Sequence, residues 1–353
     1  MSQQVDRFFL LVVLLVVVVL NFIRSGVEGF HLKVGVGNKK VLSASDDGNV
    51  AYFTVIGDYG RNGGDNQLEV AQQMAKWCTS VAPSCDFSLG VGDNFYPNGV
   101  SGIHDSQFQS SFEDVYRPRH AFGNQFYNAL GNHEYYGYAH AEVEYSLRYN
   151  NGEKHSSKFY LPNEYYARVI SVGNLNILLA VFDTSPMIES YYASSKVNMT
   201  ALVLQKDINR QLAFMQQTID SISRENQISF KIAVGHHPIK SAGKHGDNID
   251  ITKKLEPFLQ KNGFYVYLSG HDHNLQYLNG FDCNGNNCMH QIVSGGGSKV
   301  HKGEIDPTHP GLKYYLEESA FTAVQLTKSS MSVSFINHKG HVKAQFDIKN
   351  PQQ

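Results

Sequence analysis

The sequence contains several short polar motifs, each of which follows a run of β-branched or aromatic residues. Strands that end at such motifs would present the polar side chains at the edge of a sheet, where α/β proteins usually place functional groups. Carboxylates, a phenol, an amide and imidazoles are ligands of hard and borderline metal ions. Two such ions held side by side stabilise an in-line displacement at phosphorus. In chain order the motifs are Gly57-Asp58-Tyr59-Gly60, Gly92-Asp93-Asn94-Phe95-Tyr96, Gly131-Asn132-His133-Glu134, Gly235-His236-His237-Pro238 and Gly270-His271-Asp272-His273.

The ligand types indicate two unlike ions. Asp93 stands early in its loop and could give one carboxylate oxygen to each ion, whereas Asp58 would bind one ion only. Tyr96 follows Asp93 by three residues, and its phenolate would favour a trivalent ion such as Fe(III). Imidazole and amide ligands suit a divalent partner such as Fe, Zn or Mn. His271 and His273 point to opposite sides of an extended segment, so each can serve a different ion.

Each motif alone has an ordinary explanation. Gly-Asp after a strand usually marks a turn, Gly-Asn-His is usually a turn with a surface histidine, and Gly-His-x-His could be a chance pair. Five motifs in order, all after strands and with complementary ligand types, favour a binuclear metal site instead.

The bulk composition is that of a globular protein. The chain has 353 residues, 42% of them hydrophobic and 18% charged, with a formal net charge of -2. This charge gives no field that would attract nucleic acid, so we expect no nucleic-acid partner. Because no Pro/Gly-rich linker divides the body, we expect one catalytic domain over residues 45–349.

Residues 1–29 are predicted to be a secretory signal peptide. Arg7 precedes an unbroken apolar run from Phe8 to Leu20, which is too short for a comfortable membrane span. Cleavage could follow Ser25 or Gly29, and the mature protein would then have no stable membrane insertion. An uncleaved signal anchor is the alternative.

The cysteine count fits a secreted protein. Cys78 lies close to Cys85, and Cys283 lies close to Cys288, so two local disulfides are the simplest pairing. Four cysteines allow three connectivities, and the sequence leaves the choice open. Asn198 begins an Asn-Met-Thr glycosylation acceptor, which presumes a surface loop.

Hydrophobic periodicity predicts strands that alternate with helices, followed by an antiparallel set. This order indicates an α/β fold of layered sheets covered by helices. A helix over 251–262 should be kinked by Pro257 or start late because of it, and should be stopped by Gly263. The predicted strands cover 51–56, 86–91, 127–130, 165–171, 175–182, 228–234, 265–268, 321–327, 332–336 and 341–348, and the other predicted helices cover 67–77, 106–116 and 207–223.

The motif order resembles that of the purple acid phosphatases, within the calcineurin-like metallophosphoesterases, and is most similar to the small mammalian-type tartrate-resistant acid phosphatases. The resemblance runs from Phe53 to about Phe346 and includes Phe112-Glu113-Asp114-Val115-Tyr116 and the segment after the last motif, Asn274-Leu275-Gln276-Tyr277. Other calcineurin-like enzymes carry Asp-x-His where this chain has Asp58-Tyr59-Gly60, and they lack a tyrosine ligand.

The resemblance implies a fold and a ligand set. The fold would be an αββα sandwich, with two mixed sheets flanked by helices. His236 is preferred to His237 as a ligand because it aligns with the Gly-His-x-Pro motif. His133 and His245 would face the substrate as catalytic residues. The implied Fe(III) ligands are Asp58, Asp93, Tyr96 and His273, and the implied ligands of the divalent ion (Fe, Zn or Mn) are Asp93, Asn132, His236 and His271.

The resemblance also implies a secreted acid phosphatase. A metal-bound hydroxide would attack phosphorus, and His133, with His245, would protonate or stabilise the leaving alkoxide. Small phosphomonoesters or phosphoproteins would be the substrates of a monomer that is secreted or sent to a lysosome- or vacuole-like compartment. We expect His237, His104 and His155 to be surface or loop residues.

Three other functions are compatible with the same sequence features. A phosphodiesterase or nucleotide pyrophosphatase could use the same fold. A binding or anchoring protein could keep the fold without catalysis, although it would be expected to lose metal ligands, and all seven are present here. An Fe(III)/Fe(II) pair could also support redox chemistry with peroxide.

Overall fold

The structure is a computed structural model that describes residues 49–81, 84–149, 157–195, 207–284 and 287–351. The strands are β1 Ala51–Ile56, β2 Phe87–Gly90, β3 Phe126–Asn128, β4 Phe159–Tyr160, β5 Tyr166–Val172, β6 Leu175–Val181, β7 Phe230–Val234, β8 Val266–Ser269, β9 Leu275–Asn284, β10 Asn287–Ser294, β11 Leu312–Leu316, β12 Ala320–Leu326, β13 Ser330–Asn337 and β14 Val342–Lys349. The α-helices are α2 Gln67–Val81, α3 His140–Tyr149, α5 Ile208–Glu225, α6 Ile249–Lys254 and α7 Glu256–Lys261. A π-helix, η1, covers Phe108–Glu113, and four short 3₁₀ helices are η2 Arg119–Phe122, η3 Glu134–Tyr136, η4 Ser185–Met187 and η5 Glu189–Ala193.

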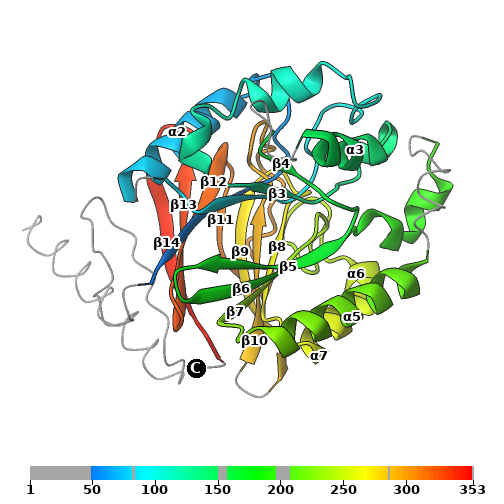
Figure 1. Ribbon diagram of the computed structural model, residues 1–353, viewed down its shortest axis with the longest axis vertical. Helices are drawn as coiled ribbons and strands as arrows, with labels where there is room; N and C mark the ends of the chain where they lie inside the picture. The colour runs from blue at the N-terminus through cyan, green and yellow to red at the C-terminus, as the bar shows by residue number, and fades with distance from the viewer. Residues whose placement is uncertain (1–48, 82–83, 150–156, 196–206, 285–286, 352–353) are drawn as a thin grey trace, which may run out of the picture. The chain divides into compact units, whose positions relative to one another are not determined.

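The strands form two seven-stranded mixed sheets (Figure 1). The first has the order β14-β13-β12-β1-β2-β3-β4, and the second has the order β11-β9-β10-β8-β7-β6-β5. Helix α2 packs on β1, β12 and β13, whereas α5 packs on β5 and β6. The expected α/β architecture of two mixed sheets flanked by helices is therefore confirmed.

Alternation along β6 divides its side chains between two apolar layers. Ile177 and Leu179 join the large core that also contains residues of β1 and β12, whereas Leu178 and Ala180 pack beneath α5 and α7. Successive side chains of a strand point to opposite faces of the sheet, so a strand buried on both faces is apolar throughout. This double burial explains why β6 is apolar without interruption from Ile177 to Val181.

The predicted helices agree with the structure except at their ends and breaks. Helix α5 begins after Asp207, whose side chain accepts a hydrogen bond from the Arg210 backbone N–H and so caps the helix. The predicted helix over 251–262 is instead two helices, α6 and α7, separated at Leu255. Pro257 explains the break because it cannot donate a backbone hydrogen bond within the helix. Gly263 has a positive φ of 68° and ends α7 as predicted.

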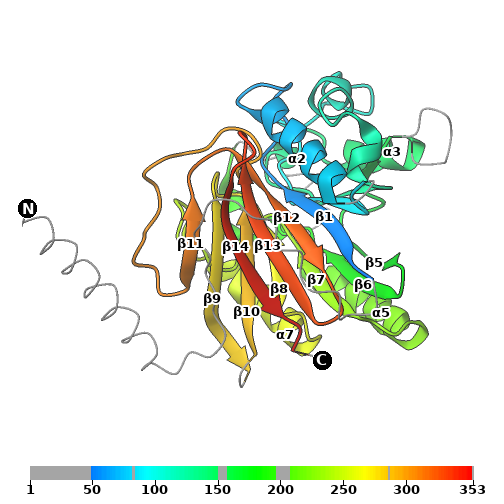
Figure 2. The same ribbon diagram turned by 90° about the vertical axis from the view of Figure 1, so that its left-hand side faces the viewer.

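Several elements were not predicted from the sequence, namely α3, β4, β9, β10 and β11. The predicted hairpin through Gly173 is present, since β5 and β6 pair antiparallel. The predicted helix over 106–116 contains the π-helix η1. The late antiparallel set is also present as β12, β13 and β14, which lie side by side in Figure 2.

One predicted disulfide, Cys78–Cys85, is present. Cys288 is also disulfide-bonded, while the side chain of Cys283 is not among those described. The signal peptide over residues 1–29, Asn198 and His155 lie outside the described residues. Within the described part of the chain, no helix combines the length and apolar character needed to cross a membrane.

The topology brings the ends of parallel strands from both sheets together. In the first sheet β1, β2 and β3 run parallel, and in the second sheet β7 and β8 run parallel. Each of these five strands leads into one of the polar motifs. A backbone hydrogen bond from Gly57 to Ser294 O (2.8 Å) links the two sheets at this edge.

Candidate metal centre

The loops after the strands hold three side chains in unusual backbone conformations. Asp58, Asp93 and His271 have positive φ values of 59°, 51° and 72°. Few residues other than glycine adopt this left-handed region, and such conformations cluster at functional sites. The backbone N–H of His271 donates to Asp58 Oδ2 at 2.9 Å, so the motifs after β1 and β8 hold each other in place.

One half of the cluster is built around the Tyr96 hydroxyl. This oxygen lies 2.9 Å from Asp58 Oδ1 and 2.8 Å from Asp93 Oδ2. It also lies 3.1 Å from Nε2 of His273. These four side chains come from three of the five motifs, and they are the ones expected to bind Fe(III).

The other half of the cluster is built around Nε2 of His236. This nitrogen lies 3.2 Å from Asn132 Oδ1, 3.2 Å from His271 Nδ1 and 3.4 Å from Asp93 Oδ2. Nδ1 of His236 lies 2.9 Å from the carbonyl oxygen of Val91, which can only accept, so Nδ1 carries the hydrogen that it donates. This hydrogen bond directs Nε2 of His236 into the cluster.

Burial and mutual repulsion make ionisation of the oxygen ligands in this cluster unfavourable unless a positive charge lies beside them. Burial raises the pKa of Asp58 to about 7, with Asp93 adding to the shift. Burial and the same two carboxylates also hold the pKa of the Tyr96 phenol well above its usual 10. For Asp93, burial is outweighed by the neighbouring His236, and its pKa is lowered. A multiply charged cation would favour the ionised forms of all three oxygen ligands.

The donor set therefore fits a pair of metal ions. Asp58, Asp93 and His236 each offer a ligand atom, and these atoms lie within 4.8 Å of one another. The Asp93 carboxylate contacts both halves of the cluster, through Tyr96 on one side and His236 on the other. Carboxylate, phenol, amide and imidazole groups are the mixture that suits one hard and one borderline ion.

Gly131 and Gly92 allow the loops to approach this closely. A Cβ atom at Gly131 would overlap the Asp93 carboxylate, and one at Gly92 would lie 2.7 Å from Nδ1 of His236. Gly92 also has a positive φ of 90°. Glycine is thus required at both positions because a side chain would collide with a ligand, and at Gly92 also because of the positive φ.

His237 lies in the loop after β7, as expected, but its side chain is not on the surface. It is buried, and its two ring nitrogens contact Thr184 Oγ1 at 2.8 Å and Tyr191 Oη at 2.7 Å. Both nitrogens are therefore occupied, and the neighbouring His236 is the one that faces the cluster. The burial was not predicted, because the local sequence gives no sign of the pocket wall that covers this side chain. His104 is exposed, as expected.

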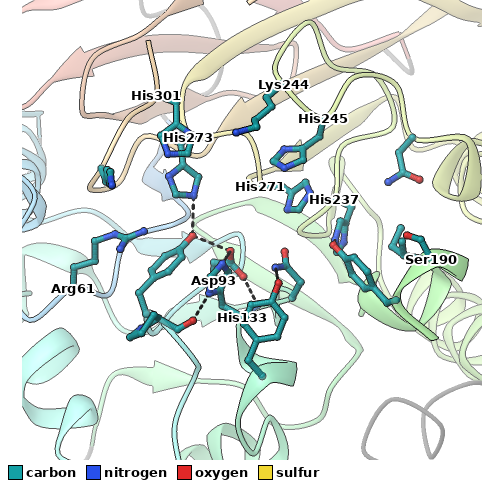
Figure 3. Close-up of a pocket in the computed structure, with 18 residues that line it drawn as sticks. Arg61, Asp93, His133, Ser190, His237, Lys244, His245, His271, His273 and His301 are labelled. Atoms are coloured by element: carbon teal, nitrogen blue, oxygen red, sulfur yellow. Dashed lines mark hydrogen bonds and ion pairs between the residues drawn. The ribbon is translucent and has the colours of Figure 1, made fainter. Parts of the chain in front are cut away.

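His133 and His245 both line the cavity above the cluster (Figure 3), which has a volume of about 570 Å³. Nδ1 of His133 contacts the carbonyl oxygen of Pro97, and its Nε2 lies 3.9 Å from Asp93 Oδ2. Nδ1 of His245 lies 2.8 Å from Asp272 Oδ1. Each ring therefore uses Nδ1 for a fixed contact and keeps Nε2 available.

Asp272 is a functional residue that the sequence reasoning did not single out. Its buried carboxylate accepts hydrogen bonds from the His245 backbone N–H (3.2 Å) and from the Ser241 hydroxyl. Burial opposes its ionisation, but the His245 hydrogen bond outweighs burial and lowers the Asp272 pKa. Its position between two candidate ligand histidines was the available signal.

Glu134 is a second residue whose role was missed. Its Oε1 accepts from the backbone N–H groups of Asn94 (2.8 Å) and Phe95 (3.3 Å), and its Oε2 accepts from those of Asp93 (3.1 Å) and Gly131 (2.5 Å). Burial and the Asp93 charge raise the pKa of Glu134 to about 8, and the Gly131 hydrogen bond opposes the shift. One side chain therefore holds the ligand loops after β2 and β3 together.

The family profile and the similar sequences point to the same protein family. The profile of the calcineurin-like phosphoesterase family matches residues 51–275. Purple acid phosphatase 3 of Arabidopsis thaliana is 33% identical over 311 residues, which cover 86% of this chain and 79% of the plant protein. Tartrate-resistant acid phosphatase type 5 of Homo sapiens is 30% identical over 319 residues, which cover 85% of this chain and 91% of the human protein.

Two solved structures share the fold. Purple acid phosphatase PPD1 from seeds of yellow lupin (Lupinus luteus) has a TM-score of 0.61 at 16% identity, over 85% of this chain and 54% of the lupin chain. GAP50, the anchor in the inner membrane complex of Plasmodium, has a TM-score of 0.69 at 20% identity, over 85% of this chain and 89% of the other. At these identities the likeness concerns the fold alone.

Replacing Glu134 by Gln should loosen the ligand loops. The amide nitrogen would face backbone N–H donors, and leaving two of them unpaired should cost roughly 2–4 kcal/mol of stability. We expect lower metal content and a lower midpoint in denaturant unfolding. Glu142→Gln is the matched control, because Glu142 is a buried carboxyl that accepts from the Asn94 side-chain amide (2.8 Å) rather than from the backbone N–H groups of the ligand loops. Equal effects of the two substitutions would contradict the role given to Glu134.

Proposed function

The chain belongs to the calcineurin-like phosphoesterases and, within them, to the purple acid phosphatases; on this premise we propose that it is a secreted acid phosphatase with a binuclear metal centre that hydrolyses phosphate monoesters. The observation that carries the proposal is the position of Asp93. Its carboxylate joins a phenol-containing group of donors to an imidazole-containing group, each assembled from loops of both sheets.

The proposed ligands follow the two halves of the cluster. When bound, the ions would neutralise the substrate phosphate and activate the attacking water. Asp93 would contact both ions, which explains why it must be buried between the two donor groups. Fe(III) would be held by Asp58, Asp93, Tyr96 and His273, and the divalent ion (Fe, Zn or Mn) would be held by Asp93, Asn132, His236 and His271.

Fixed orientation of Asn132 supports its proposed role. Its Nδ2 donates to the Tyr136 hydroxyl at 3.1 Å, and this contact turns the amide oxygen toward His236. The amide oxygen is the group that can bind a metal ion. Tyr136 itself lines the cavity and is not a proposed ligand.

His133 is the proposed proton donor to the leaving group. The Pro97 carbonyl can only accept, so it fixes the hydrogen on Nδ1 and leaves Nε2 as the atom that gains or gives a proton in the cavity. His245 would assist, since Asp272 orients its ring in the same manner. An imidazolium must be present for this step, which agrees with catalysis at acidic pH.

The proposed substrates are small phosphomonoesters or phosphoproteins, and the proposed state is a monomer. The Cys78–Cys85 disulfide supports passage through the secretory pathway, because disulfides persist in oxidising compartments. A secreted location or a lysosome- or vacuole-like compartment fits this route.

An anchoring role without catalysis, suggested by the GAP50 fold, has less support. A protein that only binds a partner has no need for two buried carboxylates that each lie within 3 Å of one phenol oxygen, because burial of such groups is unfavourable. All seven proposed ligands converge in this chain. We therefore favour the enzyme.

Tyr96→Phe should remove the visible absorption that a phenolate gives when it binds Fe(III). The expected result is a coloured oxidised protein that bleaches, or shifts strongly, in the variant. Tyr136→Phe is the matched control, because that tyrosine lines the same cavity but contacts Asn132 of the divalent half and none of the proposed Fe(III) ligands, so the visible band should be retained. An unaltered band in Tyr96→Phe would remove Tyr96 from the ligand set.

His133→Ala should keep both ions but lose roughly 10²–10⁴ in rate, the usual scale for a general acid. The loss should be large for alkyl phosphates, whose leaving groups need a proton, and small for nitrophenyl phosphate, whose leaving group does not. Steady-state kinetics on the two substrates, with elemental analysis of the variant, measure this. Equal losses on both substrates would transfer the acid role to His245.

A further inference from the structure

Arg61 is a cation at the edge of the metal cluster and is not one of the proposed ligands. It lines the cavity on the side of His273, away from His237 and His245 (Figure 3). Its guanidinium carbon lies over the Tyr96 ring, 3.7 Å from the ring centre. Guanidinium groups stack on aromatic faces, and the attraction grows when the ring carries negative charge. A metal-bound Tyr96 carries that charge, so the position of Arg61 fits the proposed ligand role of Tyr96.

Two hydrogen bonds hold Arg61 in this position. Its Nε donates to Ser298 Oγ at 3.1 Å, and its backbone N–H donates to Gln67 Oε1 at 2.9 Å. The buried Ser298 hydroxyl in turn donates to the carbonyl oxygen of Asp58 at 2.6 Å. The charged side chain is therefore tied, through one hydroxyl, to the backbone of a proposed Fe(III) ligand.

The loops that carry Arg61 and Tyr96 are also in direct contact through their backbones. The Tyr96 N–H donates to the carbonyl oxygen of Gly60 at 2.8 Å. A Cβ atom at Gly60 would lie 1.8 Å from the carbonyl oxygen of Asn94, so only glycine lets the two loops approach this closely. Backbone contacts as well as the Ser298 hydrogen bond therefore fix Arg61 relative to the Tyr96 ring.

Little negative charge outside the cluster offsets the charge of Arg61. Oδ2 of Asp65 lies 3.8 Å from Nε of Arg61, and the Asp65 side chain is half exposed, so water screens this pair. Among the described residues, none accepts a hydrogen bond from the terminal nitrogens of Arg61. The main partner of the guanidinium plane is therefore the Tyr96 ring.

We propose that Arg61 is a positioning residue that fixes the Tyr96 ring and limits how much electron density its phenolate gives to the iron. The proposal rests on the proposed function, because it requires Fe(III) at the Tyr96 oxygen. The guanidinium lies over the ring, whereas the ion would lie beyond the hydroxyl end. Because electrostatic effects weaken with distance, the positive charge acts more strongly on the phenolate than on the ion. Groups around a ligand tune a metal site in this way without binding the metal.

Two properties of the oxidised protein depend on this charge. Stabilising the phenolate electrons raises the energy of their transfer to Fe(III), so loss of the Arg61 charge should move the visible band to longer wavelength. Loss of a nearby positive charge also favours Fe(III) over Fe(II), so the reduction potential of the iron should fall. A residue that only packed against the loop would not shift these properties according to its charge.

The test records visible spectra and reduction potentials without phosphate, because an anion in the cavity would itself alter the band. Arg61→Gln and Arg61→Met remove the charge, so both should move the band to longer wavelength and lower the potential. Two neutral variants make the result independent of whether either one folds. Arg61→Lys keeps a positive charge, so its band should lie between those of the wild type and Arg61→Gln.

Lys299→Gln is the matched control for the total charge of the cavity. Lys299 is exposed and lines the same cavity, but it is not the cation that lies over the Tyr96 ring. Its replacement removes one positive charge from the rim, and the visible band should stay within a small fraction of the shift seen in Arg61→Gln.

Three results would overturn the proposal. The first is an unmoved band in both neutral variants. The second is an equal shift in Arg61→Lys and Arg61→Gln, which would indicate a purely structural role. The third is an equal shift in Lys299→Gln and Arg61→Gln, which would indicate an effect of the whole cavity. A colourless oxidised wild-type protein would overturn the proposed function together with this proposal, whereas a coloured wild type with any of these three results overturns the proposal alone.

Discussion

The structure depends on the burial of two carboxylates beside one phenol. Asp58 and Asp93 are both inaccessible to solvent, and the Tyr96 hydroxyl lies within 3 Å of each. The loops that carry these groups are held in left-handed backbone conformations at Asp58 and Asp93. Such an arrangement is costly unless positive charge enters it. The two proposed metal ions would supply that charge and would also bind the phosphate, so the requirement for stability and the requirement for catalysis would coincide.

The fold meets this constraint by joining two sheets at one edge. Strands β1 to β3 contribute the oxygen ligands, whereas β7 and β8 lead into the histidines. Around them, residues that would not touch a metal fix the geometry: Glu134 gathers four backbone N–H groups, and Val91 O orients the ring of His236. Hydrogen bonds to backbone groups of the loops thus orient the proposed ligands.

Sequence patterns predicted the parts of this arrangement that are local. Apolar runs ending in polar motifs located β1, β2, β7 and β8 to within two residues, and the seven expected ligands lie in one cluster. Contacts between distant segments were not predictable: the motif containing His237 gave no sign of Tyr191, which contacts its ring, and nothing local marked Arg61 as a partner of Ser298. Strands β9 to β11 were missed because polar and aromatic residues interrupt their apolar pattern.

Element-specific anomalous diffraction from crystals of the purified protein, with elemental analysis of the same sample, tests the assignment of two unlike ions most directly. The predicted result is two ions per chain on either side of the Asp93 carboxylate. Iron should lie on the Tyr96 side, and a divalent ion should lie on the His236 side. A single ion at full occupancy, or two ions with neither bound to Tyr96, would contradict the assignment.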